Sequence, residues 1–240
     1  MNSEGDHFPS THWSQVKVLQ QGDDIEAGRA FEDLCQRYWY PIYAFLRRSG
    51  HTPADAEDLT QGFFHRLIAE RALHTADPAH GRLRSYLLGV LKRLLSDQNR
   101  HDMAVKRGGG ESLVSFDHTD AEEIYRLEPP DLNSPDRQFD RAWAVRLLAN
   151  ATNRLREDFV QGDNIEAFDH LIEFLPLGEN ATPYREVAMR MGVEEHVVRL
   201  QVHRMRQRYR KLIELEVGQT VRDAGQIIEE LAHLMTALGR

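Results

Sequence analysis

Apolar residues along the 240-residue chain recur at steps of three and four residues in one segment after another. Side chains at that spacing lie on one side of an α-helix. No segment alternates between apolar and polar residues with the period of two that marks a strand. The pattern therefore predicts an all-α protein, with helical segments at 25–48, 53–69, 77–101, 135–159, 165–175, 184–213 and 227–238.

The segment 104–138 interrupts this pattern. It holds three consecutive glycines at 108–110, a proline pair at 129–130, and eight acidic residues against one basic residue between 111 and 136. Such a composition is typical of a linker. We therefore expect two small helical domains joined by an acidic linker and followed by a C-terminal helix, which either packs on the second domain, the favoured expectation, or receives a partner. The expected boundaries are a tail with a short helix at 1–24, a first domain at 25–103, the linker at 104–138, a second domain at 139–215 and an extension at 216–240.

Proline residues mark where helices bend or begin. Pro41 lies inside the first long apolar stripe, where the missing N–H predicts a kink or a short break. Thr52-Pro53-Ala54-Asp55 has the residue order of a helix start, with a capping hydroxyl, a proline in the first turn and an acid near the helix N-terminus. Asp77-Pro78 predicts the start of the next helix.

Charge is segregated along the chain. The net charge is −8, yet seven Arg/Lys stand against two acids within 82–107, and six against two within 194–212. Local basic segments of this kind permit contact with nucleic acid in an acidic protein. The start of the chain is polar and no apolar run reaches the length of a membrane helix, so we expect a soluble cytoplasmic protein without membrane insertion.

Several kinds of chemical site are excluded. The single cysteine, Cys35, rules out an internal disulfide and a cysteine-based zinc cluster. The scattered histidines show no paired metal-ligand spacing, and neither a phosphate loop nor a Gly-x-Ser-x-Gly motif is present. We therefore predict no catalytic residue, no metal and no cofactor.

The segment 184–213 predicts a helix-turn-helix. A short helix ends at Gly192, which can adopt the left-handed backbone of a turn, and the longer helix that follows has an apolar stripe and a separate basic side. The alternative is an ordinary pair of helices with a solvated arginine face. The residues predicted to contact duplex DNA are His196, Arg199, Leu200, His203, Arg204, Arg206, Gln207 and Arg210.

Two further polar sets lie in the first domain. The acids at 55–58 stand at a predicted helix start, where capping alone would account for them. The helix from 82 to 100 combines basic residues with a tyrosine, which suits contact with phosphates and unpaired bases, although a solvated face with Tyr86 in the core would give the same pattern. The residues of this segment predicted to contact phosphates and unpaired bases are Arg82, Arg84, Tyr86, Lys92, Arg93, Asn99 and Arg100.

These segments together resemble a bacterial RNA polymerase sigma factor of the extracytoplasmic-function type, which belongs to the sigma-70 family. DAEDLTQGF at 55–63 resembles the family segment of region two that docks on the polymerase clamp helices. GRLRSYL at 81–87, continuing to DQNR at 97–100, is similar to the segment that opens and reads the minus-ten element. The stretch 184–210 resembles region four, which contacts the minus-thirty-five element.

The resemblance implies a protein that is not an enzyme. Its partners would be core RNA polymerase and promoter DNA, and whether an anti-sigma factor also binds is left open. It assigns polymerase binding to Asp55, Glu57, Asp58, Gln61 and Phe64. The alternatives are a helix-turn-helix regulator that binds palindromic DNA without polymerase, and a helical adaptor that does not bind DNA.

Overall fold

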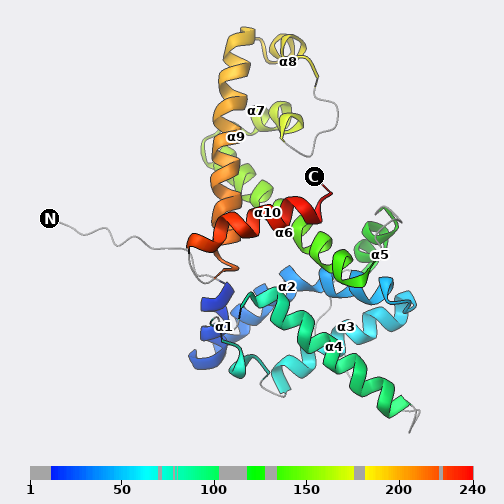
Figure 1. Cartoon of the computed structure of the whole chain (residues 1–240). Helices are drawn as coiled ribbons and strands as arrows, with labels where there is room; N and C mark the ends of the chain where they lie inside the picture. Colours follow the sequence, from blue (N-terminus) through cyan, green and yellow to red (C-terminus); the bar gives the residue numbers. More distant parts are fainter. Residues whose placement is uncertain are drawn as a thin grey trace, which may run out of the picture. The chain divides into compact units, whose positions relative to one another are not determined.

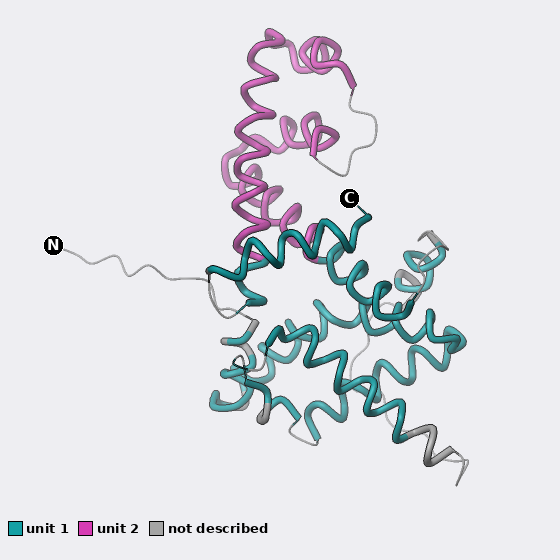
Figure 2. The backbone as a smooth tube through the Cα atoms, in the orientation of Figure 1, with its two compact units in different colours: residues 1–146, 217–240 teal, residues 147–216 magenta. Residues whose placement is uncertain are grey.

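The computed structural model describes residues 12–69, 72–77, 79, 81–102, 118–127, 134–175, 182–221 and 224–239. Within these residues every regular element is a helix and no strand occurs (Figure 1). The all-α prediction is therefore confirmed. The chain divides into two compact units (Figure 2): unit 1 is Met1–Arg146 with Val217–Arg240, and unit 2 is Leu147–Glu216.

Unit 1 includes three segments that the sequence analysis placed outside the first domain. Helix α5 (His118–Leu127) lies in the predicted linker, the first turns of α6 (Pro135–Gln161) in the predicted second domain, and α10 (Ile227–Ala237) in the predicted extension. The C-terminal helix thus belongs to unit 1, whereas the sequence placed it on the second domain. The remaining elements of unit 1 are α1 (His12–Gln21), α2 (Asp24–Arg48), α3 (Pro53–Ala69), η1 (Ala72–Thr75), α4 (Leu83–Asp102) and η4 (Ala224–Gln226).

Helix α2 is the central helix of the unit 1 core. Leu34, Tyr38 and Ile42 on this helix have no exposed surface. The helix continues through Pro41, so the expected break does not occur. The proline removes one backbone hydrogen bond, but all residues from 38 to 46 are buried, and that packing keeps the helix continuous.

Helix α4 begins later than the sequence predicted. The Asp77 carboxylate accepts a hydrogen bond from the Ala79 backbone N–H at 2.7 Å, and Gly81 has φ +121°. A positive φ is incompatible with a right-handed helix, so α4 starts after Gly81, at Leu83. Among its described side chains the buried apolar ones are Leu83, Leu87, Leu91 and Leu94.

Unit 2 contains the rest of α6, α7 (Ile165–Leu171), η3 (Ile172–Phe174), α8 (Tyr184–Met191) and most of α9 (Glu195–Gly218). Gly192 ends α8 with φ 66° and ψ 29°, the left-handed conformation expected of it. The predicted apolar stripe of α9 is confirmed, because its members are all buried: Val198, Val202, Met205, Tyr209 and Leu212.

Two residue types are confined to unit 1. The three tryptophans, Trp13, Trp39 and Trp143, belong to it and are buried. The single cysteine, Cys35, is buried in α2, and burial raises the pKa of its thiol to about 12, with a smaller contribution from Glu32. None of the described helices is both long enough and apolar enough to cross a membrane.

Candidate functional site

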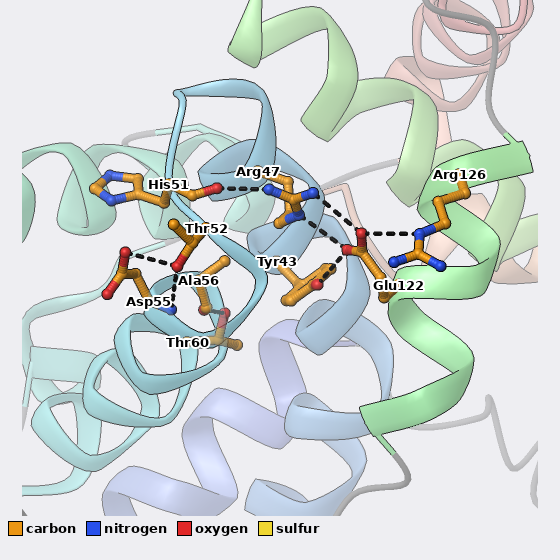
Figure 3. Close-up of polar contacts among 9 residues, drawn as sticks. All are labelled: Tyr43, Arg47, His51, Thr52, Asp55, Ala56, Thr60, Glu122 and Arg126. Carbon is orange, nitrogen blue, oxygen red and sulfur yellow. Dashed lines mark hydrogen bonds and ion pairs between the residues drawn. The ribbon is translucent and has the colours of Figure 1, made fainter.

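The first turn of α3 carries the acids of the DAEDLTQGF segment. The Thr52 hydroxyl accepts a hydrogen bond from the Asp55 backbone N–H at 3.2 Å and donates one to the Asp55 carboxylate at 2.7 Å (Figure 3). The Thr52 carbonyl accepts the N–H of Ala56 at 2.9 Å. Thr52 is therefore the helix cap that the sequence predicted, and the same contacts fix the position of Asp55.

Four of the five residues assigned to polymerase binding have accessible surface. Asp55 and Asp58 are exposed, and Glu57 and Gln61 are half-buried. We call these four residues the α3 contact face: Asp55, Glu57, Asp58 and Gln61.

Phe64 differs from the prediction. It is 4% exposed and stacks on Trp39, with ring centroids 5.8 Å apart and planes 8° from parallel. The rings of Phe31 and Phe63 meet it edge-on. These three neighbours remove Phe64 from the surface, so it supports the contact face from within the core.

A polar cluster joins α5 to α2 and to the start of α3 (Figure 3). The Glu122 carboxylate accepts hydrogen bonds from the Tyr43 hydroxyl at 2.6 Å and from Arg47 Nε at 2.9 Å. The same guanidinium donates from its NH1 group to the His51 carbonyl at 2.6 Å. Burial alone would raise the pKa of the Glu122 carboxyl, but the hydrogen bonds from Arg47 and Tyr43 hold it below its usual value.

Helix α4 carries Arg84, which is 4% exposed. It donates from Nε to Glu230 of α10 at 2.8 Å and from NH1 to Asp140 of α6, and its guanidinium lies 4.9 Å from the centre of the Trp143 ring. The sequence predicted that Arg84 contacts melted DNA. The structure instead places it inside unit 1, because two carboxylates compensate the buried charge.

The other residues predicted to take part in promoter melting lie on α4 or, in the case of Arg82, directly before it, and their surroundings differ. Arg82 pairs with Glu230 at 2.8 Å, Lys92 pairs with Asp136 at 2.7 Å, and the Tyr86 hydroxyl donates to the Ala72 carbonyl. Arg93 is exposed and forms no ion pair with any residue in the described part of the chain. The side chains of Asn99 and Arg100 lie outside the described residues.

Helix α9 presents its predicted DNA-contacting residues to solvent. All eight are exposed: His196, Arg199, Leu200, His203, Arg204, Arg206, Gln207 and Arg210. Arg199 pairs with Glu195 at 2.6 Å and lies 5.6 Å from the centre of the Tyr184 ring, while Arg206 donates to the Phe174 carbonyl at 2.9 Å. The exposed basic side of α9 is thus organised by short-range contacts within unit 2.

The start of α8 is held by an acid. The Glu173 carboxylate accepts hydrogen bonds from the Thr182 hydroxyl at 2.6 Å and from its backbone N–H at 2.9 Å, and it pairs with Arg190 at 3.4 Å. The Thr182 hydroxyl is the main reason that the pKa of Glu173 is lowered. These bonds anchor the chain that leads into α8 and α9.

Sequence reasoning missed the roles of Glu122, Asp140 and Glu230. Glu230 stands three residues after Ile227 and four before Leu234, so it falls within an apolar stripe. An acid in that position signals a buried ion pair, although the sequence does not say which cation it meets. Among the described residues, no group of three or more His, Cys, Asp or Glu could hold a metal ion.

Comparison with known proteins identifies part of unit 1. Residues 34–103, which span most of α2 and all of α3 and α4 within the described structure, match the family model of sigma-70 region 2. No match was found among curated proteins or among solved structures. The match supports a role in transcription initiation as a sigma factor of the sigma-70 family. Factors of the sigma-70 family are non-enzymatic transcription initiation factors.

Proposed function

We propose that this chain is a sigma factor of the extracytoplasmic-function type that binds core RNA polymerase and directs it to promoters. The observation that carries the proposal is the sigma-70 region 2 match over 34–103, which contains the exposed acids of α3 and the basic helix α4. In this proposal the α3 contact face binds polymerase. Carboxylates on such a surface attract a basic partner and set the orientation of docking.

The two basic helices have different tasks in the proposal. Exposed Arg93, together with Arg82 and Lys92 once these exchange their carboxylate partners for phosphates, contacts the melted minus-ten strand. Helix α9 contacts the duplex minus-thirty-five element through Arg199, His203 and their neighbours. These cations can exchange their carboxylate partners for DNA phosphates because their own side chains are partly solvated: Arg82 is 30% exposed, Lys92 49% and Arg199 65%.

Run-off transcription tests this function. Core RNA polymerase with the full chain should produce discrete transcripts from genomic fragments, and Asp58→Ala and Gln61→Ala should each lower both polymerase affinity and transcript yield by about ten-fold, the scale of a lost charged interface contact. Glu157→Gln is the matched control, because it removes an exposed acid on the part of α6 within unit 2. Unchanged affinity in both α3 variants would overturn the assignment of this face.

A polymerase-independent regulator is the competing function. It is favoured by the exposure of all eight predicted DNA-contacting residues of α9. It predicts tight binding to palindromic duplex DNA and no retention of core polymerase on the immobilised chain. Retention of polymerase together with transcription would exclude it.

A further inference from the structure

The connection between α2 and α3 is held by backbone hydrogen bonds and by the side chain of Arg47. The N–H groups of Ser49, Gly50 and His51 bond back to carbonyls at the end of α2, at 2.9 to 3.2 Å, and so close the turn on that side. On the other side, the carbonyl of His51, which precedes the α3 cap Thr52 in the chain, accepts a hydrogen bond from the NH1 group of Arg47. The peptide group between His51 and Thr52 therefore joins the guanidinium of Arg47 to the residue that caps α3.

Arg47 is itself held by α5. Its Nε and NH2 donate to the two oxygens of Glu122 at 2.9 and 3.1 Å, and its guanidinium lies 5.0 Å from the centre of the Tyr125 ring. The side chains of Arg47 and Glu122 are only 18% and 16% exposed, so solvent screens this pair less than an open surface pair. A planar guanidinium with both edges engaged has one orientation, and α5 sets it.

We propose that Glu122 is a positioning residue, and that α5, docked on α2, holds the α3 contact face in its polymerase-binding geometry through Arg47 and the His51 carbonyl. The proposal rests on the proposed function and extends it. Under this proposal α5, which lies in the predicted linker 104–138, helps to determine the affinity for polymerase. Any event that captures α5 or moves it from α2 weakens polymerase binding.

Hydrogen exchange tests the positioning directly and without polymerase. In the full chain, Glu122→Gln should accelerate exchange in peptides covering 51–58 by about ten-fold, the scale expected when a local opening becomes easier. Arg47→Lys should do the same, because it keeps the charge but lacks the planar fork that donates to Glu122 and to the His51 carbonyl in fixed directions. Glu123→Gln is the matched control, since Glu123 is an exposed neighbour on α5, and it should change nothing.

The exchange rate at the start of α3 shows whether Glu122 positions that helix or only attaches α5 to α2. If Glu122→Gln accelerates exchange only in α5, then Glu122 merely attaches that helix and the proposal is overturned. Tyr43→Phe removes one of the bonds to Glu122 and keeps the ion pair, so it should give a smaller effect at 51–58. Tryptophan fluorescence during urea unfolding will show that unit 1 of each variant is folded.

Polymerase affinity supplies the second readout. Glu122→Gln should weaken binding of core polymerase about five-fold, and its effect should shrink when Asp58→Asn is already present, since groups acting through one surface are not additive. Fully additive losses would mean that Glu122 acts outside the contact face, and would overturn the proposal. If wild-type chain does not bind polymerase while exchange at 51–58 responds to Glu122→Gln, then the proposed function fails and the positioning stands.

Discussion

Helices α4 and α9 both carry basic residues predicted to contact nucleic acid, but their cations have different neighbours. Arg84 of α4 and Arg82, which directly precedes the helix, share Glu230, and Lys92 of α4 pairs with Asp136. In α9 the predicted residues are exposed, and Arg204 and Arg210 form no ion pair with any residue that the structure describes. Nucleic acid must compete with carboxylates for Arg82, Arg84 and Lys92, whereas these two cations of α9 meet no carboxylate among the described residues and can bind phosphate directly.

The difference teaches that a basic stripe does not define a binding surface by itself. Arg84 lies on the same helix as Arg93, yet one is buried against Trp143 and the other is exposed. The two arginines differ because α6 and α10 pack over Arg84. Asp140 and Glu230 of these helices, both distant in sequence, bond to its guanidinium. A guanidinium that stacks on an indole and meets two carboxylates acts as part of the core.

The largest expected effect on stability comes from removing Glu230, the acid of α10 that Arg82 and Arg84 share. Glu230→Ala leaves Arg84 with one carboxylate in a buried site, so we expect unit 1 to lose about 3 to 5 kcal/mol of unfolding free energy. Urea unfolding followed by tryptophan fluorescence measures this loss, because all three tryptophans belong to unit 1. Glu229→Ala, an exposed acid one position earlier, should cost under about 0.5 kcal/mol. Equal effects would show that the Arg84 environment is not the cause.

The next effect concerns DNA binding by α9. Arg210→Gln should weaken binding to duplex DNA about ten-fold at low salt and reduce the salt dependence by about one counterion. Arg208→Gln serves as the comparison, because Arg208 on the same helix already pairs with Asp158 at 2.6 Å. Anisotropy titrations over a range of salt concentrations give both quantities. Similar losses in the two variants would indicate that ion pairing within the chain does not decide which cation meets DNA.

Acidification should loosen the entry to α8. The pKa of Glu173 is lower in the folded protein than its ordinary value of 4.5, so its contribution to stability is present above that pH and is lost as pH falls through the folded pKa. We expect hydrogen exchange at 182–187 to become faster between about pH 5 and pH 3. Glu173→Gln should remove most of this pH dependence. A variant as pH-sensitive as the wild type would assign the change to other carboxyl groups.

The smallest effect is expected at the surface pair of α4. Lys92 and Asp136 are each about half exposed, so Asp136→Asn should change the stability of unit 1 by less than about 1 kcal/mol. The same change should nevertheless strengthen binding of a single-stranded oligonucleotide, since it frees Lys92. Urea unfolding and anisotropy on one sample separate the two effects. Unchanged oligonucleotide binding would place Lys92 outside the nucleic-acid surface.

Elements governed by local spacing could be predicted from the sequence. The stripe from Val198 to Leu212 is buried as expected, the Thr52 cap is present, and Gly192 adopts the left-handed conformation. Each of these depends on residues within one or two helical turns. The region-two segment at 55–63 was likewise visible in the sequence, and it lies inside the matched 34–103.

Features governed by distant partners could not be predicted in this way. Arg84 meets Glu230 across 146 positions, and Glu122 meets Arg47 across 75. Phe64 follows Phe63 on α3, but Trp39 and Phe31 of α2 enclose it and bring it into the core. Helical periodicity shows which side chains share a face. It does not show which other helix covers that face.

The burial of Cys35 has a practical consequence for labelling. The chain has no other cysteine, and a thiol with a pKa near 12 is almost entirely protonated at neutral pH and unreactive toward maleimides. A cysteine introduced at an exposed position would therefore be the only reactive thiol in the native chain. The protein accepts one fluorophore or spin label at a chosen site without prior removal of Cys35.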